Sequence, residues 1–365
     1  MSWWEDMPKQ SFKERNPGKG AEPESADKKQ RKSRSTLFTA LAILTVIVLI
    51  AVTGWYVIYQ LPMQKTIIIV DGEKVSIGYF IRRVMSNPNG DDIFGTMEQL
   101  VQELIIKQEA PGYGITVSEE DIDAVLRDLA KGESESITDA EYREWYRQQL
   151  NASQLSEKDF RNIVYRGLLT QGMGELLAAQ VPSVGEQVHL NVILVGTYDE
   201  AVKIQERSNA GEEFASLARE ASLDTSTKDN GGDVGWLPPG VLDARFESAI
   251  TSLEIGKISE PFLNVDPNAT QEQQQQLGES YLLFYVSEKS VSLEIQPDHL
   301  DVLRAKALDT WLAEQMEVKK IEFRGLNSGR GFDSETNAWI GYQVQRLRKV
   351  AQGTTQQEES QGTQP

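Results

Sequence analysis

Few side chains in this sequence are suited to chemistry. Its 365 residues include 55 Asp and Glu and 37 Lys and Arg, but only two histidines and no cysteine. Without cysteine the chain has no disulfide framework and no thiolate metal site, and His189 and His299 alone are too few for a histidine-built zinc site. The sequence also lacks a P-loop, a dinucleotide fingerprint and a G-x-S-x-G elbow. We therefore expect no metal ion and no cofactor. The net charge of −18 argues against a nucleic-acid partner, which would need a basic face.

A glycine-rich turn, Asn230–Trp236, is the most specific local feature of the chain. Its sequence NGGDVGW holds three glycines within five residues. Glycine adopts positive φ and lets two backbones approach closely, while the Trp, Leu and paired Pro at and after the end of the turn supply a stiff apolar wall. Asp224 and Ser226 come shortly before it. A polar group and an apolar wall are therefore expected on either side of an unusually shaped backbone.

The elements around this turn must position those residues. Hydrophobic patterning predicts strands over 188–195 and 281–286, and helices over 199–210, 211–222 and 240–250. Three motifs follow one another: G-x-x-F-x-x-L-A-x-x-x-S from Gly211, G-G-D-x-G-W from Gly231 and L-x-x-G-x-I-S-x-P from Leu253. This order resembles the parvulin (PpiC) family of peptidyl-prolyl isomerases over roughly 188–288. The resemblance implies a domain at 186–290 with an α+β fold, in which an antiparallel-rich sheet of about four strands is flanked by helices.

The resemblance also implies a reaction and its residues. Rotation about an X–Pro bond has a barrier of ~18–20 kcal/mol because amide resonance must be broken, while the cis and trans forms differ by only ~1 kcal/mol. A catalyst can bind the proline ring in an apolar cup and favour the twisted amide with a polar group. Carried over to this chain, the cup residues are Leu242 and Phe246 and the catalytic acid is Asp224. Trp236 joins the cup as a substrate-binding residue.

Both histidines of the family's site are missing here. Val192 and Leu282 stand at their positions. His189 precedes Val192 by three residues, so the alternation of strand side chains predicts that it points to the opposite face unless the strand slips or bulges. His299 lies outside the domain. Two hypotheses follow: the domain is an isomerase with weakened catalysis, or it is a pocket that binds peptides without catalysing.

A membrane anchor is predicted near the N-terminus. Residues 37–59 form an uninterrupted uncharged run that is long enough to cross a bilayer as a helix. A basic cluster stands just before it: Lys28, Lys29, Arg31, Lys32 and Arg34. The positive-inside rule then predicts a cytoplasmic, disordered tail at 1–36 and an extracytoplasmic location for the rest of the chain. A cleaved signal peptide is the alternative.

The remaining segments complete the predicted organisation. Residues 66–181 contain a strand–turn–strand followed by capped helical patterns, and they resemble the N-terminal domain of SurA/PrsA-type extracytoplasmic foldases. A helix at 298–321 would complete that domain. The Gln-rich stretch 266–278 reads as a mobile loop. The tail at 325–365 is predicted to be mostly disordered, with a short amphipathic helix at 337–349.

Two functional hypotheses therefore stand. In the first, the chain is a membrane-anchored extracytoplasmic foldase with peptidyl-prolyl isomerase activity, acting on unfolded or proline-containing exported polypeptides. In the second, it is a chaperone or peptide-binding module that keeps the fold without the chemistry. Helix faces that expose apolar surface would serve either function. The oligomeric state is left open by the sequence.

Overall fold

The computed structural model describes residues 26–86, 92–265, 279–326 and 331–362. The chain divides into two compact units, Met1–Lys65 and Thr66–Pro365. The predicted tail falls partly, over 1–25, outside the described residues, as does the whole of the predicted loop at 266–278.

The described part of the first unit is helical. It consists of α1 (Ala26–Trp55), a π-helical turn (Tyr56–Gln60) and α2 (Leu61–Met63). Helix α1 begins at Ala26, inside the segment that the sequence predicts to be disordered. Among the described residues, one helical span, Ala40–Met63, is long and apolar enough to cross a membrane, and the protein buries none of it. This span overlaps the predicted 37–59 and is the candidate anchor.

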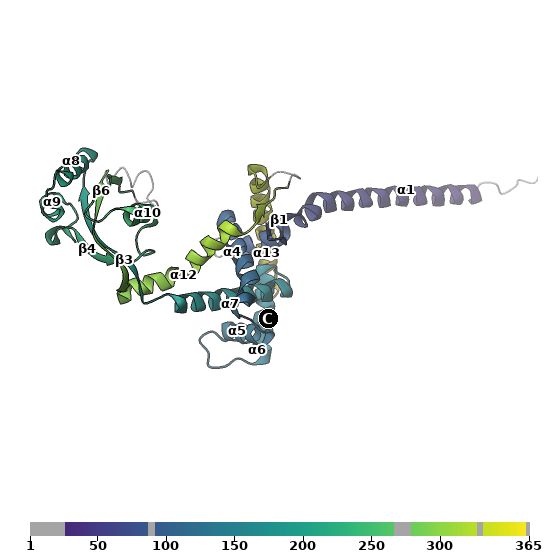
Figure 1. The fold of residues 1–365 in the computed structure, drawn as a ribbon. Coiled ribbons are helices and arrows are strands. Elements are labelled where there is room, and N and C mark those ends of the chain that lie inside the picture. Colours follow the sequence, from purple (N-terminus) through teal and green to yellow (C-terminus); the bar gives the residue numbers. More distant parts are fainter. Residues whose placement is uncertain (1–25, 87–91, 266–278, 327–330, 363–365) are drawn as a thin grey trace, which may run out of the picture. The chain divides into compact units, whose positions relative to one another are not determined.

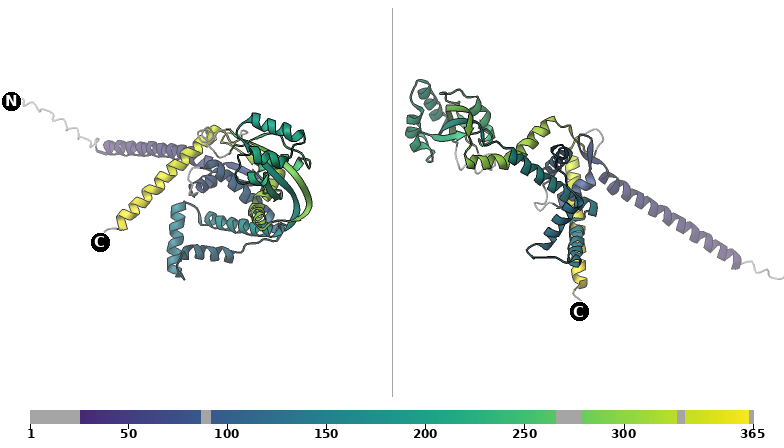
Figure 2. Two further views of the ribbon diagram at one scale, coloured as in Figure 1. Left: turned by 90° about the vertical axis from the view of Figure 1, so that its left-hand side faces the viewer. Right: turned by 60° about the horizontal axis from the view of Figure 1, so that its bottom comes forward.

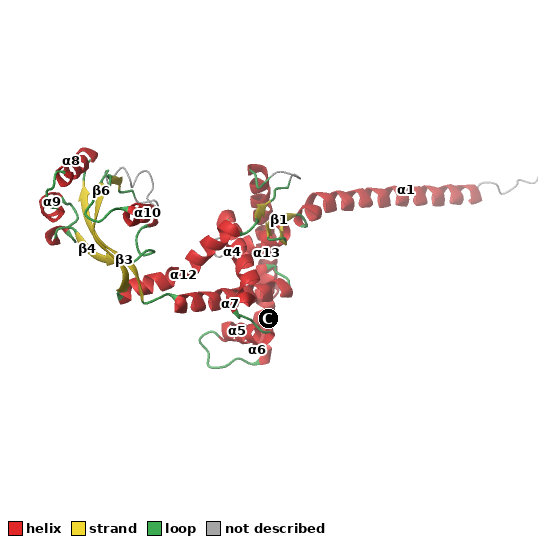
Figure 3. Ribbon diagram, in the orientation of Figure 1, coloured by secondary structure: helices red, strands yellow, loops and turns green. Residues whose placement is uncertain are grey.

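The second unit opens with a helical region, in which helices follow a short β-hairpin (Figure 3). Its elements are β1 (Thr66–Val70), β2 (Glu73–Ser76), α3 (Ile77–Ser86), α4 (Ile93–Glu109), a 3-10 turn (Ala110–Tyr113), α5 (Glu119–Lys131), α6 (Asp139–Ser153) and α7 (Glu157–Gln180). Ser118, Thr138 and Ser156 each accept a hydrogen bond from the backbone N–H three residues later, as the sequence predicts, and so cap α5, α6 and α7.

The chain later returns to this helical region (Figures 1 and 2). The returning elements are α12 (Pro297–Val318), β7 (Ile321–Phe323) and α13 (Ser334–Gly362). Helix α12 packs along α7, β7 pairs antiparallel with β1, and α13 packs on α3. Trp311 of α12 donates its Nε1–H to Tyr113 Oη at 3.0 Å, which connects the returning helix to the 3-10 turn after α4.

The C-terminal helix is longer than the sequence predicts. Helix α13 covers 334–362, where the sequence predicts a helix only over 337–349 in a mostly disordered tail. Its Ile340 and Val344 are fully or almost fully buried. Packing of these two side chains on the helical region stabilises a segment whose polar composition alone favours disorder.

The middle of the second unit is a separate antiparallel sheet with helices. Its elements are β3 (Val184–Val195), α8 (Tyr198–Asn209), α9 (Phe214–Ala221), a 3-10 turn (Lys228–Asn230), β4 (Asp233–Leu237), α10 (Ala244–Ser252), β5 (Phe262–Leu263) and β6 (Tyr281–Glu294). The strand order is β4-β3-β6-β5, and every neighbouring pair is antiparallel. The predicted α+β fold is confirmed.

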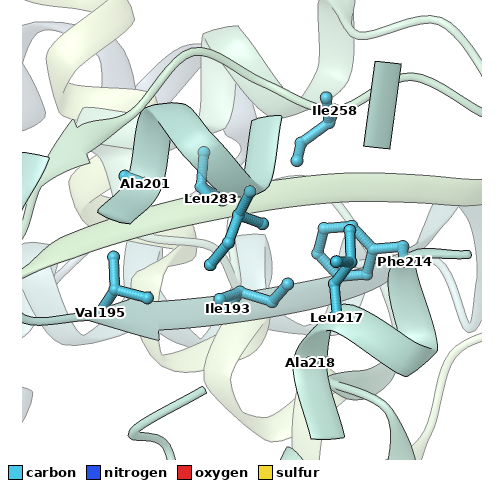
Figure 4. Close-up of a cluster of buried hydrophobic side chains, with 9 residues drawn as sticks. Ile193, Val195, Ala201, Phe214, Leu217, Ala218, Ile258 and Leu283 are labelled. Atoms are coloured by element: carbon cyan, nitrogen blue, oxygen red, sulfur yellow. The ribbon is translucent and has the colours of Figure 1, made fainter. Parts of the chain in front are cut away.

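The two faces of this sheet carry separate apolar cores. Ile193 and Val195 of β3 pack with Phe214 and other side chains of α8 and α9 on one face (Figure 4). Val188, Leu190 and Val192 of β3 belong to the core on the other face, with α10. Strand β3 keeps its alternation along its whole length because the extra residues at the register shifts lie on β4 and β6.

Candidate functional site

An apolar cup lies on the α10 face of the sheet. Leu242 and Phe246, the two predicted cup residues, belong to one cluster with Val192 and Leu282. Phe246 is 8% exposed and forms the floor, while the other three side chains are half-buried. The positions at which the family has histidines are therefore part of the same surface as the cup. In this chain that surface is aliphatic and aromatic.

Two aromatic residues that sequence reasoning missed complete the floor. Phe262 of β5 and Phe284 of β6 lie against Phe246, with ring centroids 5.5 and 5.2 Å from it and 5.6 Å from each other. The signal for Phe284 was its spacing of two residues from Leu282, which places both on one face of a strand. No comparable signal marks Phe262, because β5 has only two residues.

The glycine-rich turn holds the strand beneath the cup. Gly231 and Gly232 have φ of +73° and +79°, which side-chain-bearing residues rarely adopt. A Cβ on Gly232 would lie 2.4 Å from the carbonyl oxygen of Val192. In return, the Val192 N–H donates to the Gly232 carbonyl at 2.7 Å. The predicted need for positive φ and close approach is confirmed, and its effect is to fix the backbone of a cup residue.

Asp224 organises the loop that leads into this turn. Its Oδ1 accepts hydrogen bonds from the backbone N–H and Oγ of Ser226 at 3.0 and 2.5 Å, and its Oδ2 accepts one from Thr227 Oγ1 at 2.6 Å. The loop is attached to β3 through the Leu223 N–H, which donates to the Leu194 carbonyl at 2.7 Å. Burial acts to raise the pKa of Asp224, but the three hydrogen bonds together outweigh it and hold the pKa below its ordinary 3.8. The carboxylate is thus ionised and bound within the loop at neutral pH.

The pKa of Asp224 gives a prediction for pH dependence. We expect any isomerisation rate to be flat from about pH 5 to 8, because Asp224 stays ionised and Val192 and Leu282 do not titrate. The folded pKa is lowered, so the stabilisation from its hydrogen bonds is present above pH 3.8 and is lost as pH falls through the folded value. Rates measured across this range would contradict the expectation by an inflection near about pH 6.5, where unperturbed imidazoles titrate.

Trp236 and His189 lie on the opposite face from the cup. The sequence prediction groups Trp236 with Leu242 and Phe246, but Trp236 pairs across β3 and β4 with His189, and their rings are 5.1 Å apart. Their neighbours in the two strands, Val188 and Leu237, are the ones that join the cup core. The pleat of β4 therefore separates Trp236 from Phe246.

Both ring nitrogens of His189 lie next to polar side chains on that second face. Its Nδ1 lies 2.8 Å from Ser287 Oγ and its Nε2 lies 3.5 Å from Asp233 Oδ1. The alternation of β3 predicts this placement, since an odd offset from Val192 points a side chain away from the cup. His189 does not substitute for the missing histidines.

A paired charge lies against the cup floor. The Arg245 guanidinium lies 4.8 Å from the centre of the Phe246 ring and binds the Asp243 carboxylate. Hydrogen bonds from Arg245 lower the pKa of Asp243 to about 2. Within the parts of the chain that the structure describes, no three His, Asp or Glu side chains are grouped to hold a metal ion.

Comparison with known families agrees with this geometry. The family model for the PpiC-type peptidyl-prolyl isomerase (rotamase) domain matches residues 195–273. Over this stretch the chain is similar to PpiC-type peptidyl-prolyl isomerase domains. Asp224, Trp236, Leu242 and Phe246 lie within the matched stretch. Val192 and the whole of β6 lie outside it, so the match leaves out the two positions at which this chain departs from the family.

Parts of the chain are similar in sequence to proteins that are named foldases. The foldase protein PrsA of Caldanaerobacter subterraneus subsp. tengcongensis is 52% identical over 69 residues, which is 19% of this chain and 22% of that protein. Foldase protein PrsA 2 of Listeria monocytogenes serovar 1/2a is 29% identical over 185 residues, 47% of this chain and 60% of that protein. The chain thus spans between about a fifth and three fifths of the length of these relatives. A crystal structure of the Bacillus cereus peptidylprolyl isomerase PrsA has a TM-score of 0.35 and 17% identity, covering 78% of this chain and 92% of that one. In sequence the chain is PrsA-like.

Proposed function

We propose that this protein is a foldase that binds unfolded polypeptides and isomerises X–Pro bonds in its PpiC-type domain. The observation that carries the proposal is the cup, in which Leu242 and Phe246 share one half-buried apolar surface with Val192 and Leu282. A proline ring that packs on this surface would bring its amide next to apolar side chains, which would remove water from that amide. The substrates are proline-containing segments of unfolded chains.

The cup can lower the rotation barrier without an imidazole. A planar amide owes its large dipole to resonance, and twisting the C–N bond removes that resonance. An apolar environment therefore destabilises the planar ground state more than the twisted transition state. With Val192 and Leu282 at the positions of the family's histidines, desolvation of the amide is the contribution to catalysis that this surface can make. Asp224 contributes by holding the loop beside β3, through its bonds to Ser226 and Thr227.

A second apolar surface supports binding of longer client segments. A groove runs between the loop after β4 and helices α7 and α12. Its apolar lining includes Leu177, Pro238, Pro239, Leu303 and Trp311. A polypeptide held there would present neighbouring segments to the isomerase domain and would be kept from aggregating. This groove supports the foldase function independently of catalysis.

We further propose that Ala40–Met63 anchors the protein in a membrane with the N-terminus cytoplasmic. The support is the apolar span together with the basic cluster that precedes it in the sequence. Both folded regions would then act outside the cytoplasm, on exported polypeptides. Because the chain has no native cysteine, labelling single introduced cysteines from either side of the membrane tests this orientation.

The substitution Phe246→Leu tests the isomerase. We expect kcat/KM for a proline-containing peptide to fall about tenfold or more in the full-length protein in detergent, because the cup loses its aromatic floor. The matched control is Phe214→Leu, which makes the same change at a side chain with similar burial, 5% against 8%, on the opposite face of the sheet. The control should keep its rate within about twofold of the parent.

The same experiment separates the two functional hypotheses. Loss of activity in Phe246→Leu but not in Phe214→Leu supports the isomerase. If the parent shows no catalysis but suppresses aggregation of an unfolded client, the isomerase proposal is wrong and the peptide-binding alternative stands. That alternative is favoured by one observation, the absence of an imidazole at Val192 and Leu282.

A further inference from the structure

The loop that carries Leu242 is held from two sides. It runs from Pro238 to Asp243 between β4 and α10, and Gly240 lies at its centre. The Gly240 N–H donates to Glu247 Oε1 of α10 at 2.5 Å. On the other side, Lys306 Nζ of α12 donates to the Gly240 carbonyl at 2.9 Å. The two peptide groups that flank the Gly240 Cα are thus held from different sides, one by the helix that bears the cup floor and the other by α12.

Gly240 is suited to this clamp. Its φ is +89°, and a Cβ there would lie 2.8 Å from Leu303 Cδ2 of α12. A side chain at this position would therefore be strained by its backbone conformation and would displace the end of the Leu303 side chain.

Helix α12 is itself fixed at its other end. Trp311 and Leu312 are buried, and Trp311 is hydrogen-bonded to Tyr113. Lys319, just past the helix, forms ion pairs with Asp71 and Glu109. The C-terminal part of the helix that carries Lys306 is therefore fixed to the helical region.

We propose that Lys306 is a positioning residue for the isomerase site, acting through the Gly240 carbonyl on Leu242 and on the first turn of α10. Leu242 follows Gly240 by two residues. Asp243, the next residue, is the N-cap of α10, and the positive charge of Lys306 stabilises its carboxylate. Events in the helical region, such as the binding of a client segment, reach the cup through this contact. The catalytic part of this inference rests on the proposed isomerase function, whereas the structural part does not.

Hydrogen exchange in the full-length protein tests the structural part. The Val241 N–H bonds to the Pro238 carbonyl at 3.3 Å, and the Phe246 N–H to the Asp243 carbonyl at 2.9 Å. In Lys306→Met we expect both amides to exchange about two- to fivefold faster, since an exposed charged contact contributes modestly. The control Arg304→Met removes a cation on the same helix whose partner is Asp301. It should leave both amides unchanged.

Kinetics with a proline-containing peptide test the catalytic part. We expect Lys306→Met to lower kcat about two- to fivefold with little change in KM, and Lys306→Arg to restore most of it. Equal exchange and equal kcat in Lys306→Met and Arg304→Met would overturn the inference. Faster exchange throughout the sheet would also overturn it, because it would indicate general destabilisation. If the parent protein does not isomerise, the proposed function fails, and the exchange of Val241 and Phe246 still decides whether Lys306 holds the loop.

Discussion

Replacing Glu103 with Gln should destabilise the helical region by about 3–5 kcal/mol, the usual cost of removing one partner from a buried ion pair. Glu103 of α4 is shared by two arginines: its carboxylate accepts from both Nη atoms of Arg83 at 2.5 and 3.2 Å, and from Arg166 Nη1 at 3.3 Å. The three side chains are between 6% and 11% exposed. Gln keeps the shape of Glu but leaves two buried guanidinium groups with no negative charge between them.

The charged side chains of this triad can be buried only because they are paired. Burial acts to lower the pKa of Arg83, but the charge and hydrogen bonds of Glu103, with a contribution from Tyr79, outweigh it and raise the pKa. The triad joins the consecutive helices α3 and α4 to α7, which comes much later in the sequence. Loss of its single carboxylate therefore affects the packing of three helices together.

Hydrogen exchange of the backbone amides of α4, measured in the full-length protein, reports the loss of stability in Glu103→Gln. The control is Glu98→Gln, the same change on the exposed side of the same helix, which should alter stability by less than about 0.5 kcal/mol. A triple variant, Arg83→Met with Glu103→Leu and Arg166→Met, should recover most of the lost stability, because apolar residues often replace a buried ionic triad without cost. Equal protection in Glu103→Gln and Glu98→Gln would mean that the charges contribute nothing to this packing.

The parts of the fold that sequence predicted are those set by local rules. The caps at Ser118, Thr138 and Ser156 follow from side-chain hydrogen bonding within one turn. The turn at Gly231 and Gly232 follows from the backbone conformations that only glycine adopts easily. The alternation of β3 also held, because the bulges fell on its neighbours.

The parts that sequence could not predict depend on which elements meet in space. Phe262 and Phe284 join Phe246 from different strands. The spacing of Phe284 from Leu282 predicts its face of β6, but no spacing in the chain predicts the contact of Phe262 with Phe246. Trp236 follows a glycine turn that does reach the cup strand, yet the pleat of β4 turns its ring to the other face. The sequence does not predict the packing of α13, because one of its buried residues, Gln343, is polar and interrupts the apolar pattern of Ile340 and Val344.

Replacing Gly232 with Ala should destabilise the domain built on β3, β4, β5 and β6 by roughly 2–4 kcal/mol, because two costs add at one residue. The first cost is backbone strain, since φ is +79° and a side chain there costs about 1–2 kcal/mol. The second is steric: the new Cβ would lie 2.4 Å from the Val192 carbonyl oxygen, and that oxygen belongs to a strand that cannot move freely. The 2.7 Å hydrogen bond between the Val192 N–H and the Gly232 carbonyl would lengthen or break.

The control Gly211→Ala separates these two costs. Gly211 has φ of +98°, so Ala there is also strained, but nothing lies within 4 Å of the added Cβ. We therefore expect a loss of only about 1–2 kcal/mol at Gly211, with the difference between the variants reporting the close approach to Val192. Because the Gly232 contact fixes a cup residue, peptide affinity should fall in Gly232→Ala and not in Gly211→Ala under conditions where both remain folded. Equal losses of stability and unchanged affinity in the two variants would show that the turn needs glycine for its conformation alone, and that it does not hold the cup.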